Sequence, residues 1–140
     1  MSKAFDKVDH YKLLKVLNSL RFPLHFIEWI SDYLTNRKQR VCLYGCKSDS
    51  VDVTSSVPQG TVLAPFLFSV YIASQKPVHP ETTMCKYAYN VTIMFPFNAD
   101  IVNEDLVKMQ AEIQNITSWI LEHNLVLNDD KLCSLTINTS

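Results

Sequence analysis

Several patterns are absent from this chain of 140 residues, and each absence excludes a class of protein. Glycine occurs only twice, at Gly45 and Gly60, so neither a GxGxxG dinucleotide-binding loop nor a P-loop is present. No apolar run reaches the roughly 18–20 residues that cross a bilayer, and the first residues contain no hydrophobic signal segment. These absences predict an intracellular protein, in the cytoplasm or the nucleus, that is not secreted and does not contact a membrane.

Cysteine and histidine are few and scattered. The four cysteines form no CxxC pair, and the four histidines show no repeated metal-ligand spacing. Cys42 and Cys46 could suggest a metal site, but no histidine lies near either of them in the sequence. We therefore expect four reduced thiols rather than a disulfide framework or a zinc site.

The composition is that of one globular domain, and the charge is divided unevenly along it. Apolar residues make up 47% of the chain, whose length is close to the roughly 150 residues of a typical domain. Through Lys47 the chain has nine basic and four acidic residues, net +5, and from Ser48 onward four basic and ten acidic, net −6, which gives the total of −1. The basic first part could face a polyanion, although solvated helix faces produce the same asymmetry.

Hydrophobic periodicity predicts helices that alternate with short strands. Asp9 can cap the first helix, Pro23 and Pro65 can each begin another, and the last helix carries apolar residues in steps of three and four. The order predicts an α+β fold with an antiparallel sheet and helices packed on one face. The expected helices are 10–20, 23–36, 65–72 and a last one that Asn103 can cap and Asn124 can stop (apolar stripe Val102, Leu106, Met109, Ile113, Ile116, Ile120). The expected strands are 39–44, 50–54, 82–88 and 91–95, with one or two closing strands from 125–127 and 132–137.

A general search for catalytic patterns finds one candidate. Asp129 and Asp130 are an adjacent pair of carboxylates in a polar segment before an expected strand. They could hold a metal ion, or they could belong to a solvated turn.

Four sequence blocks, in order, resemble the reverse transcriptases of non-LTR (LINE-type) retrotransposons. The first is SKAFDKVDH at residues 2–10, and the second, at residues 22–40, contains Tyr33-Leu34 and NRKQR. The third, SSVPQGTVLAPFLF at residues 55–68, is similar to that family's SGVPQGSVLGPLLF block. The fourth, from Ser118-Trp119 to Lys131, is similar to the family's WL…N.L.LN..K block. The resemblance covers nearly the whole chain and implies a polymerase palm.

The resemblance also implies a chemistry, phosphoryl transfer to a primer 3′ end by two Mg²⁺ ions held by aspartates. In the family two of these aspartates follow each other in an [FY]-A-D-D hairpin, where this chain has Tyr87-Ala88-Tyr89-Asn90. A phenol is neutral at pH 7 and a poor Mg²⁺ ligand, and an amide brings no charge. The family's first aspartate would precede Met1. We therefore expect no intact catalytic residue, no metal site and no cofactor, although the family uses Mg²⁺.

Other matched residues could retain contacts with nucleic acid. By resemblance, Gln59 and Gly60 lie near nucleotide and template, and Lys131 donates a proton to the departing pyrophosphate. Alternatively, Pro58-Gln59-Gly60 only shapes a turn and Lys131 is only solvated. The basic cluster of Arg37, Lys38 and Arg40 could neutralise phosphates, or it could serve a helix end and solubility.

Together these observations predict that residues 1–140 are a partial, degenerate reverse-transcriptase domain, comprising the palm without fingers or thumb. The ancestral activity would be RNA-templated DNA synthesis, now lost. Alternatives are a nucleic-acid- or protein-binding module on the palm scaffold, and a translated remnant without function. The partners that we expect are RNA or an RNA–DNA hybrid, bound weakly, and other copies of the chain that associate through uncovered apolar faces.

Overall fold

The computed structural model describes residues 4–88, 90–97 and 102–137, and of Val102 and Asp129 it describes the backbone alone. In chain order, η1 (Ala4–Lys7), α1 (His10–Ser19) and α2 (Leu24–Leu34) precede four short strands, β1 (Lys38–Gln39), β2 (Cys42–Leu43), β3 (Cys46–Lys47) and β4 (Val51–Asp52). Then come α3 (Leu63–Ala73), β5 (Thr83–Tyr87), β6 (Asn90–Met94), α4 (Val102–Glu122) and η3 (Asp129–Lys131). The α+β fold class is confirmed.

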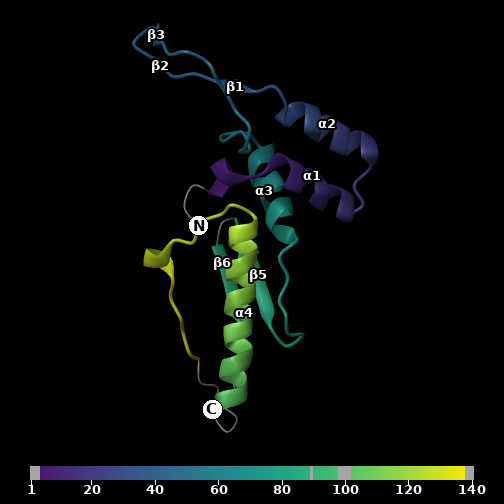
Figure 1. Ribbon diagram of the computed structural model, residues 1–140, viewed down its shortest axis with the longest axis vertical. Helices are drawn as coiled ribbons and strands as arrows, with labels where there is room; N and C mark the ends of the chain where they lie inside the picture. The colour runs from purple at the N-terminus through teal and green to yellow at the C-terminus, as the bar shows by residue number, and fades with distance from the viewer. Residues whose placement is uncertain (1–3, 89, 98–101, 138–140) are drawn as a thin grey trace.

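Helices α1, α2 and α3 form one end of the molecule, and the β5–β6 hairpin with α4 forms the other (Figure 1). Helix α1 begins where the sequence predicts, because the Asp9 carboxylate accepts a hydrogen bond of 2.9 Å from the Lys12 N–H. Leu13 and Leu17, one turn apart, are fully buried. Within the first end, helix α3 is apolar on nearly all sides and is largely buried, with Phe68 and Tyr71 fully enclosed.

The junction of the two ends depends on α3 and the end of α4. The Tyr71 hydroxyl donates a hydrogen bond of 3.1 Å to the backbone oxygen of His123, and the Trp119 and His123 rings stack with centroids 4.0 Å apart. The Lys12 ammonium donates to the backbone oxygen of Glu122. Contacts from α1, α3 and α4 therefore fix one corner of the core.

Strand pairing in the described residues is limited to three antiparallel two-stranded sheets, β1–β4, β2–β3 and β5–β6. The expected strands 39–44 and 50–54 belong to a hairpin that turns at Tyr44 and Gly45, both at positive φ. Its strands are broken where Arg40 has no ladder partner. This segment, residues 37–53, projects from the body as an exposed arm (Figure 1). We call it the arm.

Three predictions about the C-terminal half and its side chains are wrong. Residues 125–127 and 132–137 form no strand; η3 and irregular backbone stand there instead. Among the described side chains of the α4 stripe, Ile116 and Ile120 are buried, whereas Leu106, Met109 and Ile113 are exposed because the helix extends past the core. The sequence favours the core rather than a stacking surface for the aromatic side chains, yet Phe66 and Phe97 are exposed. No described helix is long and apolar enough to cross a membrane.

Candidate functional site

The β5–β6 hairpin carries the residues that the sequence singled out first. Tyr87 pairs with Asn90 across the turn, so Asn90 is the first residue of β6. The sequence placed Asn90 in the turn, between strands 82–88 and 91–95, and that prediction is wrong. Ala88 takes the positive φ of 48° that the two-residue turn requires, and Tyr89 lies outside the described residues. Tyr87 is 83% exposed and Asn90 is exposed, so both side chains face solvent.

Lys86 fixes this hairpin to α3. Its ammonium donates to the backbone oxygen of Ile72 at 2.7 Å and to that of Gln75, carbonyls at the C-terminal end of α3, where a cation is favoured. Burial, with a smaller effect of nearby Lys76, lowers the pKa of Lys86. The turn is thereby held at a defined place against the helix.

The Pro58-Gln59-Gly60 turn is bound to the N-terminal segment. The Gln59 amide donates a hydrogen bond of 2.6 Å to the Asp6 carboxylate, and the Val57 N–H donates to the backbone oxygen of Phe5 at 3.1 Å. Gly60 has a φ of 81° and nothing within 4 Å of an added Cβ. The amide that the resemblance would direct toward a nucleotide is therefore engaged by a carboxylate of the same chain.

Two of the three basic-cluster residues have partners within the chain. The Arg37 guanidinium donates to the backbone oxygen of Ser56 at 3.3 Å, and the Lys38 ammonium lies 3.5 Å from the Asp52 carboxylate across the β1–β4 ladder. Arg40 is exposed at the break in the arm. The three residues of the predicted cluster therefore do not act as one group: Arg37 and Lys38 have partners within the chain, and Arg40 is exposed.

The remaining candidates lie in the segment after α4. Lys131 ends η3 and is exposed, and its backbone N–H donates to the Asn128 oxygen at 3.0 Å. Asp129 and Asp130 belong to the same short helix. All four cysteines are free, and the ladder register places Cys42 and Cys46 on opposite faces of the arm, so they cannot share a metal ion.

Comparison with known proteins decides the family. Residues 1–138 match the family model described as reverse transcriptase (RNA-dependent DNA polymerase). The chain belongs to the reverse transcriptase family. It is 27% identical to the RNA-directed DNA polymerase from mobile element jockey of Drosophila funebris, over 100% of the chain and 16% of that protein. It is also 27% identical to the probable RNA-directed DNA polymerase from transposon BS of Drosophila melanogaster, over 94% of the chain and 15% of that protein.

A third relative is a retrovirus-related Pol polyprotein. The chain is 26% identical to the retrovirus-related Pol polyprotein from type-1 retrotransposable element R2 of Nasonia vitripennis, over 98% of the chain and 14% of that protein. The chain therefore spans about one sixth of the length of the curated relatives it matches. No solved structure matches it.

The described residues of this reverse-transcriptase chain do not fit a two-magnesium site. Mg²⁺ prefers several hard, charged oxygen ligands in octahedral geometry, whereas the described hairpin residues Tyr87, Ala88 and Asn90 contribute no carboxylate. In residues 4–88, 90–97 and 102–137, no group of three or more His, Cys, Asp or Glu side chains could hold a metal ion.

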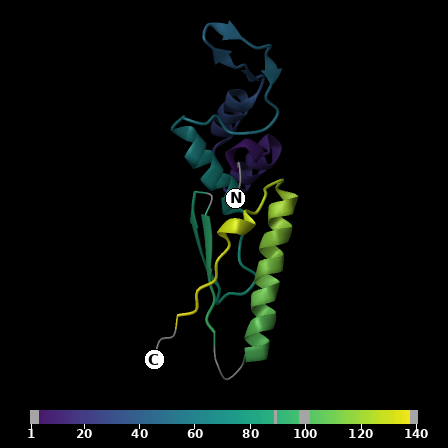
Figure 2. The same cartoon turned by 90° about the vertical axis from the view of Figure 1, so that its left-hand side faces the viewer.

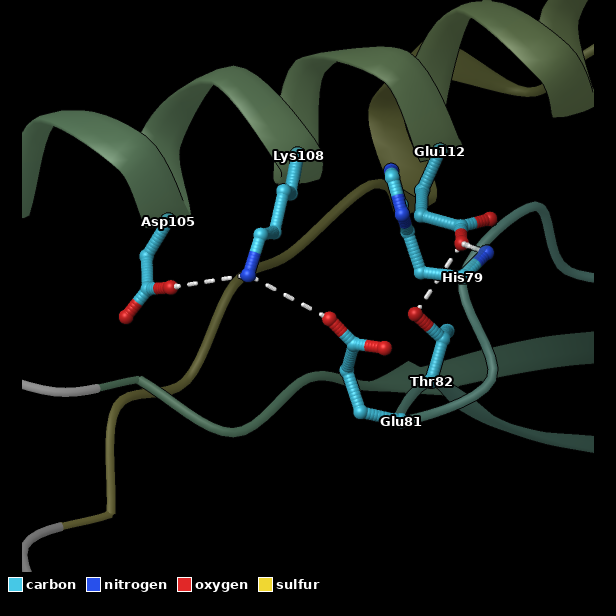
Figure 3. A network of polar contacts seen from close by, with 6 residues as sticks. All are labelled: His79, Glu81, Thr82, Asp105, Lys108 and Glu112. Atoms are coloured by element: carbon cyan, nitrogen blue, oxygen red, sulfur yellow. Dashed lines mark hydrogen bonds and ion pairs between the residues drawn. The ribbon is translucent and has the colours of Figure 1, made fainter.

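The sequence reasoning missed a buried carboxylate in this reverse-transcriptase chain. Glu112 of α4 is 1% exposed and accepts hydrogen bonds from the N–H groups of Val78 and His79 and from the Thr82 hydroxyl, at 2.7–3.0 Å to one oxygen (Figure 3). Burial acts to raise the pKa of Glu112, but these hydrogen bonds outweigh it and lower the pKa below its ordinary value. One signal was available, since Glu112 lies four residues before Ile116 and so on the buried side of α4.

Lys108, one turn before Glu112 on α4, takes part in ion pairs. The Lys108 ammonium is 3.4 Å from Glu81 and 3.9 Å from Asp105 (Figure 3), and the Asn115 amide donates to the Lys76 oxygen at 2.9 Å. These contacts and those of Glu112 fasten residues 76–82 to one side of α4. The loop that leads into β5 is therefore fixed, and with it the start of the hairpin.

Proposed function

We propose that this chain is a reverse-transcriptase domain of non-LTR retrotransposon origin that no longer polymerises. The observation that carries the proposal is the hairpin sequence Tyr87-Ala88-Tyr89-Asn90, which stands where the resemblance implies tandem aspartates. Neither a neutral phenol nor a neutral amide offsets the charge of a metal ion that must stabilise both the attacking and the leaving oxygens.

Primer extension tests this proposal. We expect purified protein to add no nucleotide to a primed RNA template with Mg²⁺ or Mn²⁺ over a long incubation, as resolved on a gel. Templated extension that depends on dNTPs would contradict the proposal.

A paired variant, Tyr89→Asp with Asn90→Asp, separates the hairpin from the rest of the site. We expect no extension by this variant either, because two adjacent carboxylates alone bind Mg²⁺ only weakly. Extension by the double variant alone would show that the hairpin change by itself silenced the domain.

A second candidate function is a nucleic-acid contact through the arm, and its exposure supports this proposal. Arg40 and Lys47 are exposed, and Tyr44, at the tip, is 98% exposed. A projecting two-stranded ribbon with cations and a free ring can contact phosphates and stack on an unpaired base.

Fluorescence anisotropy of a labelled RNA–DNA hybrid, measured across salt concentrations, tests this second candidate. We expect weak binding that falls steeply with salt and a shallower salt slope for Arg40→Ala with Lys47→Ala. The control, Lys7→Ala with Lys15→Ala, removes the same charge from exposed sites outside the arm and should leave the slope unchanged. Absence of binding at low salt would favour the third reading, a remnant without function.

A further inference from the structure

The β5–β6 sheet has an open edge along β6. Tyr87 and Asn90 are partners on either side of a two-residue turn, the position that is hydrogen-bonded in such hairpins. The backbone N–H and C=O groups of Val91 and Ile93 therefore point away from β5. In the described residues β6 pairs with no other strand. These groups therefore form a template to which an extended segment can add.

Helix α4 presents an uncovered apolar flank on the same side as that edge. Lys108 and Asn115 reach toward residues 76–82, and at 3.6 residues per turn Leu106 and Ile113 lie roughly 150° around the helix from them. Residues 76–82 and β6 lie on opposite sides of α4 in Figure 1. The flank, formed by Leu106, Met109 and Ile113, is exposed, with Ile113 at 53%.

The segment 132–137, which we call the tail, has the alternating pattern of a strand that could add to the β6 edge beside the α4 flank. It contains no charge and no proline, and Cys133, Leu135 and Ile137 alternate with Ser134 and Thr136. Leu135 is 84% exposed and the tail pairs with no strand. One molecule therefore contains both an open strand edge beside the apolar flank and a strand-like tail that is exposed.

We propose that the β6 edge and the α4 flank of one copy bind the tail of a second copy, in a reciprocal exchange. Within one chain the tail runs in the same direction as β6, and both views show it descending beside the hairpin (Figures 1 and 2). Parallel pairing of isolated short strands is the less stable kind, whereas a two-fold axis across the strands presents the second copy's tail antiparallel.

The area that the exchange covers agrees with a weak dimer. Each copy contributes six apolar side chains, three from the tail and three from the flank, each burying on the order of 80 Å². The total is roughly 1,000 Å², near the lower limit for specific interfaces. We therefore expect association at roughly 10–100 µM. It should not weaken with salt, since neither the tail nor the flank carries a charge.

Sedimentation of the full chain across concentrations and salt tests the exchange. We expect a concentration-dependent dimer that Leu135→Lys abolishes. This side chain is 84% exposed, so the substitution leaves the monomer folded. Ile113→Lys should act likewise from the other surface. Leu24→Lys, a matched leucine at 68% exposure on α2, should leave the dimer intact. A dimer that survives Leu135→Lys, that Leu24→Lys abolishes or that 0.5 M salt dissolves would overturn the proposal.

Amide hydrogen exchange locates the contact. The Val91 and Ile93 amides should exchange quickly in dilute protein and at least tenfold more slowly at high concentration, and Leu135→Lys should remove that protection. Protection that is the same at every concentration would mean that the tail pairs within its own chain, which would also overturn the proposal.

Discussion

Replacing the Glu112 carboxylate should loosen the attachment of residues 76–82 to α4. One carboxylate oxygen accepts from Val78, His79 and Thr82 at 2.9, 2.7 and 3.0 Å, and the other lies 3.1 Å from the Val78 nitrogen. Glu112→Gln keeps an acceptor oxygen for the first three contacts but places an amide donor against the Val78 N–H. Glu112→Ala removes every acceptor.

The expected magnitudes follow from the strength of charge-assisted hydrogen bonds. A hydrogen bond to a charged group contributes about 1.5–3 kcal/mol and one to a neutral group about 0.5–1.5 kcal/mol. Glu112→Gln weakens three bonds, but an amide is less costly to bury than a carboxylate, so we expect a loss of about 1–2 kcal/mol. Glu112→Ala leaves three donors without an acceptor and should cost about 3–5 kcal/mol.

Urea denaturation followed by far-UV circular dichroism measures both losses. The control is Glu122→Gln, an exposed carboxylate on the same helix, which should change the free energy of unfolding by less than about 0.5 kcal/mol. If Glu112→Gln and Glu122→Gln unfold at the same urea concentration, Glu112 does not hold the loop.

The same experiment at low pH tests the sign of the pKa shift. Because the pKa of Glu112 is lower in the folded chain than its ordinary value of 4.5, its contribution is complete above that value and is lost as the pH falls through the folded pKa. The natural chain should therefore lose more stability below pH 4.5 than Glu112→Gln does. Parallel losses in the two proteins would show that another group is responsible.

Three further predictions concern the core and the turns. Burial raises the pKa of Tyr71 from 10.0 to about 12, so its contribution to stability is present below pH 10 and is lost between pH 10 and 12. Urea melts of the natural chain and of Tyr71→Phe at pH 8 and pH 11 should show a smaller alkaline loss of stability in the variant. An equal loss in both proteins would contradict this prediction. Leu13→Ala, at a fully buried position, should cost about 2–5 kcal/mol, whereas the same change at exposed Leu24 should cost under about 1 kcal/mol, and a thermal melt distinguishes the two. Gly60→Ala should cost about 1 kcal/mol from the positive φ alone, since nothing lies near the added methyl group; a loss above about 3 kcal/mol would point to a clash that the structure does not contain.

Local chemistry explains what the sequence determined about this protein. The Asp9 cap and the helices that became α1 and α3 were predicted, because capping and hydrophobic patterns depend on neighbouring residues. The arm's turn at Tyr44-Gly45 and the β5–β6 hairpin follow from short-range signals as well. The four family blocks depend on residue identity alone, so the family was predicted without any coordinates.

Tertiary structure decided which surface each residue finally meets. Leu106 and Ile116 belong to one stripe by sequence, yet only Ile116 is buried, because the core ends partway along α4. Arg37 and Lys38 read as one cluster with Arg40, but partners distant in sequence engage the first two. The tail has the pattern of a strand, but a strand forms only where another backbone offers unpaired hydrogen-bonding groups beside it. No pattern within a single segment can specify such a neighbour, since it is the folding of the rest of the chain that brings it there.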